Sequence, residues 1–245
     1  MKFSIYTIFA VLLLSAVSCK EDNKEGTMSL HFKAVYDGQP LQTFTTQPYD
    51  NGQQIQLTHM SMFVSDIELT QASASRNLKD IELVNLSYDN LSAAEEGYTI
   101  TLSGVPAGTY DGIQFGVGVP ADLNAKTPAD FPSSSPLSKT GYYWNAWGSY
   151  IFSKTEGRLD TLGNGLPELG FALHVGSDDL FRILQATVPL TIEDGKTLDL
   201  DVLVDYRILL QGIDIKSNPQ NHTQTDVANI TALVNNMPAA FSLVQ

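Results

Sequence analysis

Residues 55–64, Ile55-Gln56-Leu57-Thr58-His59-Met60-Ser61-Met62-Phe63-Val64, alternate in character with a period of two, which is the period of a β-strand. The odd-numbered face begins with Ile55 and Leu57 and then becomes polar at His59 and Ser61. On the even-numbered face the apolar side chains are those of Met60, Met62 and Val64. Because the apolar set changes faces, the pattern predicts a β-bulge or a strand that is buried on both faces.

The same period extends to both sides of this stretch. Leu30, Phe32 and Ala34 share one face of an earlier segment, and later runs of alternating apolar residues are separated by Gly and Pro. Within residues 198–204, Leu and Val alternate with Asp199 and Asp201, which we interpret as a solvated strand face rather than an acid/base pair. The sequence therefore predicts a mainly β fold, an antiparallel β-sandwich.

Two long loops and one helix complete the predicted fold. Residues 124–140 are rich in Pro, Ser and Ala, and residues 161–170 are rich in Gly and contain a Leu-Pro pair, so both are predicted to be loops. Near the C-terminal end an apolar stripe of helical period begins at Thr225 or Asp226 and is predicted to end at Pro238.

The first residues resemble the signal peptide of a bacterial lipoprotein. Lys2 supplies a positive charge, residues 5–14 are apolar, and four small residues at 15–18 precede Cys19. The apolar run is too short to span a membrane. We expect cleavage before Cys19 and lipidation of its thiol, and the alternative is an ordinary signal peptide followed by an unrelated cysteine.

The residues after the cysteine, Lys20-Glu21-Asp22-Asn23, resemble the export signal that sends many Bacteroidetes lipoproteins to the cell surface. A solvated tether is the alternative interpretation. The expected location is the outer membrane, held there by lipid, with exposure at the cell surface if the export signal operates. The predicted organisation is a signal peptide at 1–18, a lipidated tether at 19–27 and a single β domain at 28–245.

The composition excludes several classes of function. A formal net charge of −13 argues against nucleic acid and against an anionic membrane surface as partners, so the lipid is the only expected membrane contact. Cys19 is the only cysteine, which excludes disulfides and thiolate metal sites from the domain. The sequence has no HExxH, no GxSxG, no P-loop and no EF-hand loop, so we predict a binding protein rather than an enzyme and expect no organic cofactor.

Both tryptophans of the chain lie in one aromatic segment, Gly141-Tyr142-Tyr143-Trp144-Asn145-Ala146-Trp147-Gly148-Ser149-Tyr150, between the two predicted loops. Such aromatic density favours a ligand site. One interpretation is a glycan- or peptide-binding surface lipoprotein in which Tyr142, Tyr143, Trp144 and Trp147 form a stacking platform. Another is that these rings fill the core and rim of the sandwich.

A more specific pattern is Trp144-x-x-Trp147-x-x-Tyr150, followed by Phe152-x-Lys154-x-Glu156-Gly157 and then by Phe171-x-x-His174-x-Gly176. Together with residues 57–67, 105–110 and 115–119 and with His222, it resembles the MbnP-like copper-binding family. That family is named after a protein encoded beside methanobactin genes in methanotrophs, and many Bacteroidetes lipoproteins are similar to it. The resemblance covers almost the whole chain after Cys19.

The resemblance implies a β-sandwich-like protein that holds one copper ion, chiefly as Cu(I), through two imidazoles and an oxidised tryptophan, a kynurenine. His174 and His222 are then the implied ligands, and Trp144 and Trp147 are candidates for oxidation or for packing against the metal. The implied partner is a di-haem cytochrome c peroxidase-like enzyme, which oxidises the tryptophan in relatives. The implied role is the sequestration or delivery of copper outside the cytoplasm.

The residues themselves leave alternatives open. Two convergent imidazoles can bind copper without cysteine, and the third donor would be a modified tryptophan, Met60, Met62 or water. In some relatives the modified tryptophan directly precedes a ligand histidine, whereas Ala172 and Leu173 precede His174 here. Either the aromatic group comes from elsewhere in the chain, or the chain keeps the fold without the copper chemistry.

Other polar residues are assigned to the surface. His31 and His59 face solvent in the predicted strand register and are left out of the site. Lys154 and Glu156, two residues apart on one strand face, are interpreted as a surface ion pair of little energetic weight.

Overall fold

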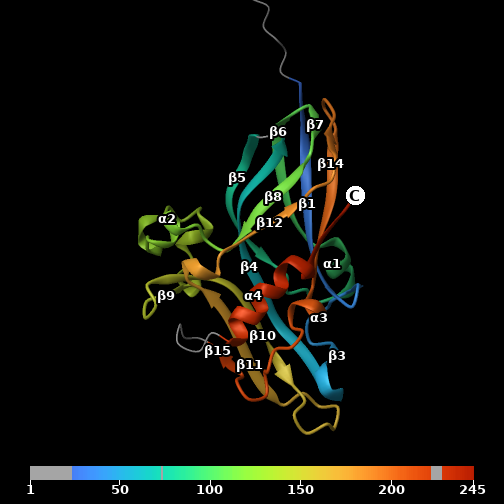
Figure 1. The fold of residues 1–245 in the computed structure, drawn as a ribbon, viewed down its shortest axis with the longest axis vertical. Helices are drawn as coiled ribbons and strands as arrows, with labels where there is room; N and C mark the ends of the chain where they lie inside the picture. Colours follow the sequence, from blue (N-terminus) through green and yellow to red (C-terminus); the bar gives the residue numbers. More distant parts are fainter. Residues whose placement is uncertain (1–23, 73, 222–227) are drawn as a thin grey trace, which may run out of the picture.

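The computed structural model of the chain describes residues 24–72, 74–221 and 228–245. The predictions for the signal peptide, for Cys19 with the charged residues after it, for His222 and for the first turn of the C-terminal helix lie outside the described residues. Figure 1 shows an elongated molecule in which the first strand, β1 (Glu25–Tyr36), begins at one end of the long axis. This strand starts ahead of the predicted domain start at Met28.

Within the described residues, the strands form two large mixed sheets and one small sheet. The five-stranded sheet consists of β1, β2 (Gln39–Pro40), β6 (Tyr98–Pro106), β14 (Thr197–Asp205) and β16 (Phe241–Val244). The nine-stranded sheet consists of β3 (Thr46–Pro48), β4 (Gln54–Gln71), β5 (Ala74–Asn85), β8 (Gly112–Val117), β9 (Tyr143–Trp144), β10 (Ser149–Leu159), β11 (Leu169–Gly176), β12 (Arg182–Ala186) and β15 (Gln220–Asn221). The small sheet pairs β7 (Gly108–Tyr110) with β13 (Leu190–Ile192).

β4 is the long central strand of the nine-stranded sheet. Its first half pairs with β10, and its second half pairs with β5 and β8. The pairing with β10 skips one residue, because His59 lies opposite Glu156 and Leu57 lies opposite Gly157. This bulge at Thr58 confirms the predicted change of faces. Before the bulge the buried residues are Ile55 and Leu57, and after it they include Met60 and Met62. Beyond the bulge the strand is also buried on both faces.

The five-stranded sheet is built around β1 and β14. These strands pair in parallel, as do β11 and β15, whereas the other pairs of the large sheets are antiparallel. The acidic residues of β14 lie on the outer face, where Asp199 is 3.2 Å from His31 and Asp201 is 2.7 Å from Lys33. The predicted solvated strand face and the mainly β fold are therefore confirmed, with mixed rather than purely antiparallel sheets.

The described helices are short except for the last one. They are α1 (Leu91–Glu96), α2 (Ala121–Asn124), α3 (Tyr206–Leu209) and α4 (Ala228–Ala240). The predicted end of the C-terminal helix at Pro238 is wrong, because α4 continues to Ala240. Pro238 lies in the last turn, where its missing N–H removes one hydrogen bond, and burial of Met237 and Ala240 on either side offsets that loss.

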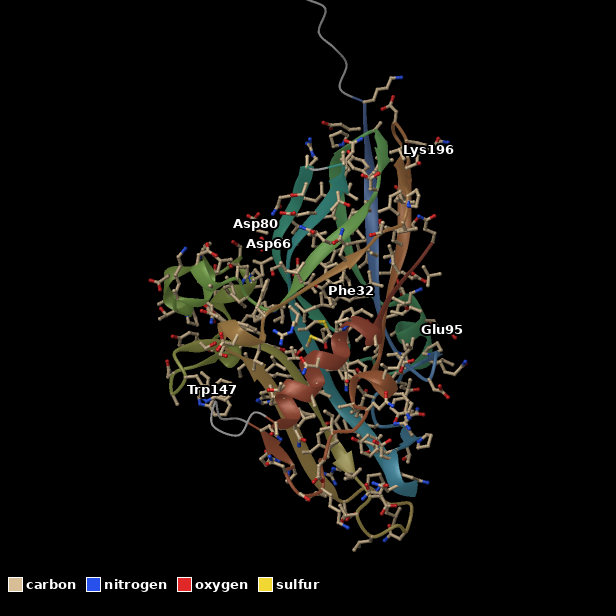
Figure 2. All side chains as sticks on the ribbon, in the orientation of Figure 1. Phe32, Asp66, Asp80, Glu95, Trp147 and Lys196 are labelled. Carbon is tan, nitrogen blue, oxygen red and sulfur yellow. The ribbon has the colours of Figure 1, made fainter. Side chains whose placement is uncertain are left out.

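The C-terminal helix joins the two large sheets. α4 contacts β11 of one sheet and β14 and β16 of the other, and Figure 1 shows it crossing the middle of the molecule. Figure 2 shows Phe32 in the interior and Trp147 at the periphery. None of the helices in the three described ranges is long and apolar enough to cross a membrane.

The predicted long loops are present with some local structure. The first holds short 3-10 turns at Pro128–Asp130 and Pro136–Ser138. The second connects β10 to β11 at the end of the molecule opposite to the start of β1 (Figure 1). In a hairpin the loop length helps to set which residues of the two strands lie opposite each other.

Candidate functional site

One face of the nine-stranded sheet carries a row of polar side chains. The register places Glu156 of β10 opposite His59 of β4, and it places Lys154 opposite Ser61 of β4 and His174 of β11. Because side chains alternate between the two faces of a strand, these five lie on the same side of the sheet. We call the set His59, Ser61, Lys154, Glu156 and His174 the histidine face.

His174 is the more enclosed partner of an ion-pair contact on this face. Its side chain is 11% exposed, and its Nε2 atom lies 2.8 Å from Oε1 of Glu156, whose side chain is 35% exposed. An ionised carboxylate only accepts hydrogen bonds, so the imidazole N–H donates to it. The two residues are diagonal neighbours across β10 and β11, a spacing that long side chains can bridge.

Both tryptophans lie next to His174. β9 carries Trp144 and pairs with the first residues of β10, and the turn between the two strands carries Trp147. The two indole rings are stacked, with centroids 4.4 Å apart and an interplanar angle of 13°. Trp144 meets the His174 ring edge to face, with centroids 6.4 Å apart. The structure thus brings together His174, Trp144 and Trp147 of the predicted site.

Gly176 makes room for the stacked tryptophans. A Cβ atom at this position would lie 3.0 Å from Cζ3 of Trp147 and 2.9 Å from the carbonyl oxygen of Tyr150. These distances are shorter than or at the limit of normal carbon contacts, so any other residue would displace the indole. The glycine of the sequence pattern His174-x-Gly176 is therefore needed for packing.

The site opens onto a cavity of about 680 Å³. Its lining includes Trp147 and His174, and Asp178, Asp179 and Arg182 contribute charged groups. The imidazole of His174 is therefore part of the wall of this cavity.

Lys154 does not pair with Glu156, so the predicted surface ion pair is wrong. Its Nζ atom donates to the carbonyl oxygen of Gly141 at 2.8 Å and lies 4.4 Å from the centroid of the Tyr142 ring. Glu156 instead binds His174. Burial lowers the pKa of Lys154, and the negative charge of Glu156 opposes this shift. Lys154 therefore fixes the segment that carries the aromatic residues.

His59 is half-buried, so its assignment to the exposed surface is wrong. Its Nε2 atom is 3.0 Å from Oγ of Ser61, and its Nδ1 atom is 3.4 Å from Oγ of Ser87. The hydroxyl of Tyr142 donates to the same Ser61 oxygen at 2.9 Å and covers this end of the face. Burial lowers the pKa of His59, although the carboxylate of Glu156 opposes the shift.

None of the other residues predicted as copper donors is placed on the histidine face by the described structure. Met60 and Met62 are fully buried on the opposite, core-facing side of β4, so neither thioether lies on the histidine face. His222 lies outside the described residues. The residue before it, Asn221, belongs to β15 and is in parallel register with Leu173, the residue before His174.

The four aromatic residues proposed as a stacking platform do not share one surface. Tyr142 packs edge to face on Phe63 with centroids 5.6 Å apart, and Tyr143 packs in the same way on Tyr150 at 5.1 Å. The two tryptophans stack on each other instead. Much of the aromatic segment therefore belongs to the core and its rim.

Fold and site together define a class of protein. It has two mixed β-sheets joined by a C-terminal helix, and a half-buried histidine lies beside a stacked tryptophan pair at the end of a sheet. The model of the MbnP family matches residues 25–226. The chain belongs to the MbnP family.

A solved structure supports the same fold. MbnP from Methylosinus trichosporium matches with a TM-score of 0.60 and 16% sequence identity, over 90% of this chain and 98% of that chain. At this identity the match shows the fold and does not by itself transfer a site. No curated protein matches the chain.

Proposed function

We propose that this chain is a copper-binding lipoprotein of the cell envelope, held at the outer membrane by lipid on Cys19. Its role would be to sequester or deliver copper, mainly as Cu(I), and not to catalyse a reaction. The observation that carries the proposal is the position of His174, which is half-buried, bound to a carboxylate and in contact with a tryptophan beside an open cavity.

The donor chemistry of the site fits copper. Neutral imidazole is a good ligand for late first-row metals, and a site without cysteine or methionine on the same face must rely on it. Among the described residues, no group of three or more His, Cys, Asp and Glu side chains could hold a metal ion. A copper site at His174 therefore needs a donor from outside that set.

His222 is the donor we propose. It follows Asn221 directly in the sequence, and Asn221 is paired with Leu173 beside His174. β15 pairs with the strand that carries His174, and it is the last described element before residue 222. The short parallel pairing of β15 with β11 is thus the structural support for a two-histidine site.

Trp144 is the candidate for oxidation, because its ring contacts His174 directly. Conversion to kynurenine would cleave the C2–C3 bond of the indole, with one atom of dioxygen added to each of the two carbons to give N-formylkynurenine, and hydrolysis would then release formate. The partner proposed for this oxidation is a di-haem cytochrome c peroxidase-like enzyme. A kynurenine would add a carbonyl oxygen and an aromatic amine as further donors next to the imidazole.

The test uses lipid-free protein beginning at Lys20, produced with and without such a di-haem enzyme. Bound copper is measured by elemental analysis, and oxidation is measured by intact mass and peptide mapping. We expect one copper per chain, lost in His174→Ala and in His222→Ala, and a modification that maps to Trp144. Folded protein that takes up no copper in either preparation would refute the proposal.

A glycan- or peptide-binding role is the second candidate, and it rests on the stacked tryptophan pair, of which Trp147 lines the cavity. The Trp144→Ala/Trp147→Ala double variant should lose glycan binding under this candidate. Copper held by the histidines alone would survive in the same variant. Binding of a glycan panel to the wild type, abolished in the double variant, would favour this second role.

A further inference from the structure

Glu156 occupies a central position on the histidine face. Its strand, β10, is paired on one side with β4 and on the other with β11, so its backbone is fixed by hydrogen bonds in both directions. From this strand its carboxylate reaches diagonally to His174, with 2.8 Å between Oε1 and Nε2. Because β10 and β11 are paired, this side-chain hydrogen bond fixes the distance and the orientation of Glu156 and His174 relative to each other.

The contact also determines the tautomer of the imidazole. Because the carboxylate accepts, the ring proton must lie on Nε2, and the lone pair of a neutral ring then lies on Nδ1. Charge-assisted hydrogen bonds of this kind are about twice as strong as neutral ones. Histidines that bind metals commonly donate their other N–H to a carboxylate, which fixes the ring and raises its basicity.

We infer that Glu156 is a positioning residue that holds His174 as the Nε2–H tautomer and presents Nδ1 as its metal-binding nitrogen. The inference rests on the proposed function for its copper part, whereas its tautomer part concerns the metal-free protein. Glu156 itself need not touch the metal. Its role is to select one of two nitrogens and one ring orientation before copper arrives.

The first experiment measures the tautomer without metal. The ¹⁵N shifts of the His174 ring are recorded by NMR in metal-free protein at neutral pH, with assignment from the His174→Ala spectrum. We expect protonated Nε2 and unprotonated Nδ1 in the wild type, and a mixture of tautomers in Glu156→Ala. In Glu156→Gln the amide oxygen still accepts, so the wild-type tautomer should be partly retained.

A matched control is Glu68→Gln. Glu68 lies on β4 and accepts a hydrogen bond from Gln114 at 2.7 Å, so the substitution makes the same chemical change away from the histidine face. It should leave the His174 signals unchanged. Wild-type Nε2–H signals in Glu156→Ala would overturn the inference.

The second experiment measures Cu(I) affinity by competition with a chromophoric chelator. Removal of a carboxylate behind a metal-binding histidine typically weakens binding about 10–100-fold. We expect a loss of that size in Glu156→Ala, a smaller loss in Glu156→Gln and none in Glu68→Gln. Circular dichroism establishes that each variant is folded.

The outcomes separate this inference from the proposed function. If His174→Ala loses copper but Glu156→Ala binds it as tightly as wild type, the positioning role is overturned and the proposed function stands. If the wild type binds no copper, the proposed function fails, and the inference then stands or falls on the tautomer of the metal-free protein.

Discussion

The pKa of His59 lies below its ordinary value because the ring is half-buried beneath Tyr142. The folded protein therefore favours neutral imidazole, whereas the unfolded chain has a histidine pKa of about 6.5 and takes up the proton more readily. This group contributes stability that is present above about pH 6.5 and is lost as the pH falls through the folded pKa.

We predict that His59→Gln loses less stability on acidification than the wild type. Thermal unfolding midpoints measured from about pH 7 to pH 5 should fall more steeply in the wild type, because only that protein must protonate a half-buried ring. The other titratable groups are common to both proteins and cancel in the comparison. Parallel curves would show that His59 titrates like an exposed histidine.

Single residues of the site were predictable only in part. The spacing of Trp144, Trp147 and His174 singled out residues that the structure does bring together. Glu156 was missed as a partner of His174, although its alternation with Lys154 placed both on one strand face. The contact depends on the register of β10 with β11, and a shift by one residue would turn Glu156 to the other face.

At the scale of elements, the β10–β11 hairpin sets that register. The carboxylate of Asp160 accepts backbone N–H groups from the loop, donated by Leu162, Gly163, Asn164 and Gly165. Burial acts to raise the pKa of Asp160, but these donors outweigh it and hold the pKa below the ordinary value. The loop is thus organised around one side chain.

We predict that Asp160→Ala loosens the hairpin loop, because four N–H groups lose their acceptor. Hydrogen exchange of residues 161–167 should accelerate, while exchange in β1 and β14 stays as in the wild type. Glu168→Ala is a useful comparison, since Glu168 accepts from Thr161 at the base of the same loop. Unchanged exchange in Asp160→Ala would mean that backbone pairing alone orders the loop.

The stacked tryptophans depend on the end of β11. We predict that Gly176→Ala separates the rings, because the new Cβ would lie 3.0 Å from the Trp147 indole. The exciton signal of the stacked indoles in circular dichroism should weaken, with a destabilisation of about 1–3 kcal/mol from overpacking. Gly170→Ala on the same strand is the control, since a Cβ there meets no atom within 4 Å. A Gly176→Ala signal equal to that of the wild type contradicts the prediction.

The bulge at Thr58 was predictable from sequence because an apolar set that changes faces leaves few alternatives. The end of α4 was not predictable in this way, because a proline such as Pro238 inside a helical pattern usually ends the helix. Here the packing of Ala240 outweighs one lost hydrogen bond. Local patterns therefore predict how a strand is buried better than where a helix ends.

At the scale of the whole molecule, alternation predicted the mainly β fold but not its sheet order. The parallel pairing of β1 with β14 joins segments far apart in the chain, and side-chain alternation is the same in parallel and antiparallel pairs. The bracing of both sheets by α4 likewise depends on tertiary packing that a single helical stripe does not specify.

The proposed membrane attachment also belongs to this scale. We predict that the wild-type protein incorporates an alkyne-labelled fatty acid during growth and that Cys19→Ser does not, because the thiol is the acylated group. Lipid-free protein starting at Lys20 should fold with the same circular dichroism spectrum, since it keeps all of the described strands, the first of which begins at Glu25. Labelling of the Cys19→Ser protein would place the lipid elsewhere.

Copper K-edge X-ray absorption of the copper-loaded protein tests the central claim most directly. We predict nitrogen donors with the multiple-scattering pattern of coordinated imidazole, and a smaller imidazole contribution in His174→Ala. A spectrum without imidazole scattering, or one that is the same in the wild type and in His174→Ala, would contradict a copper site at His174.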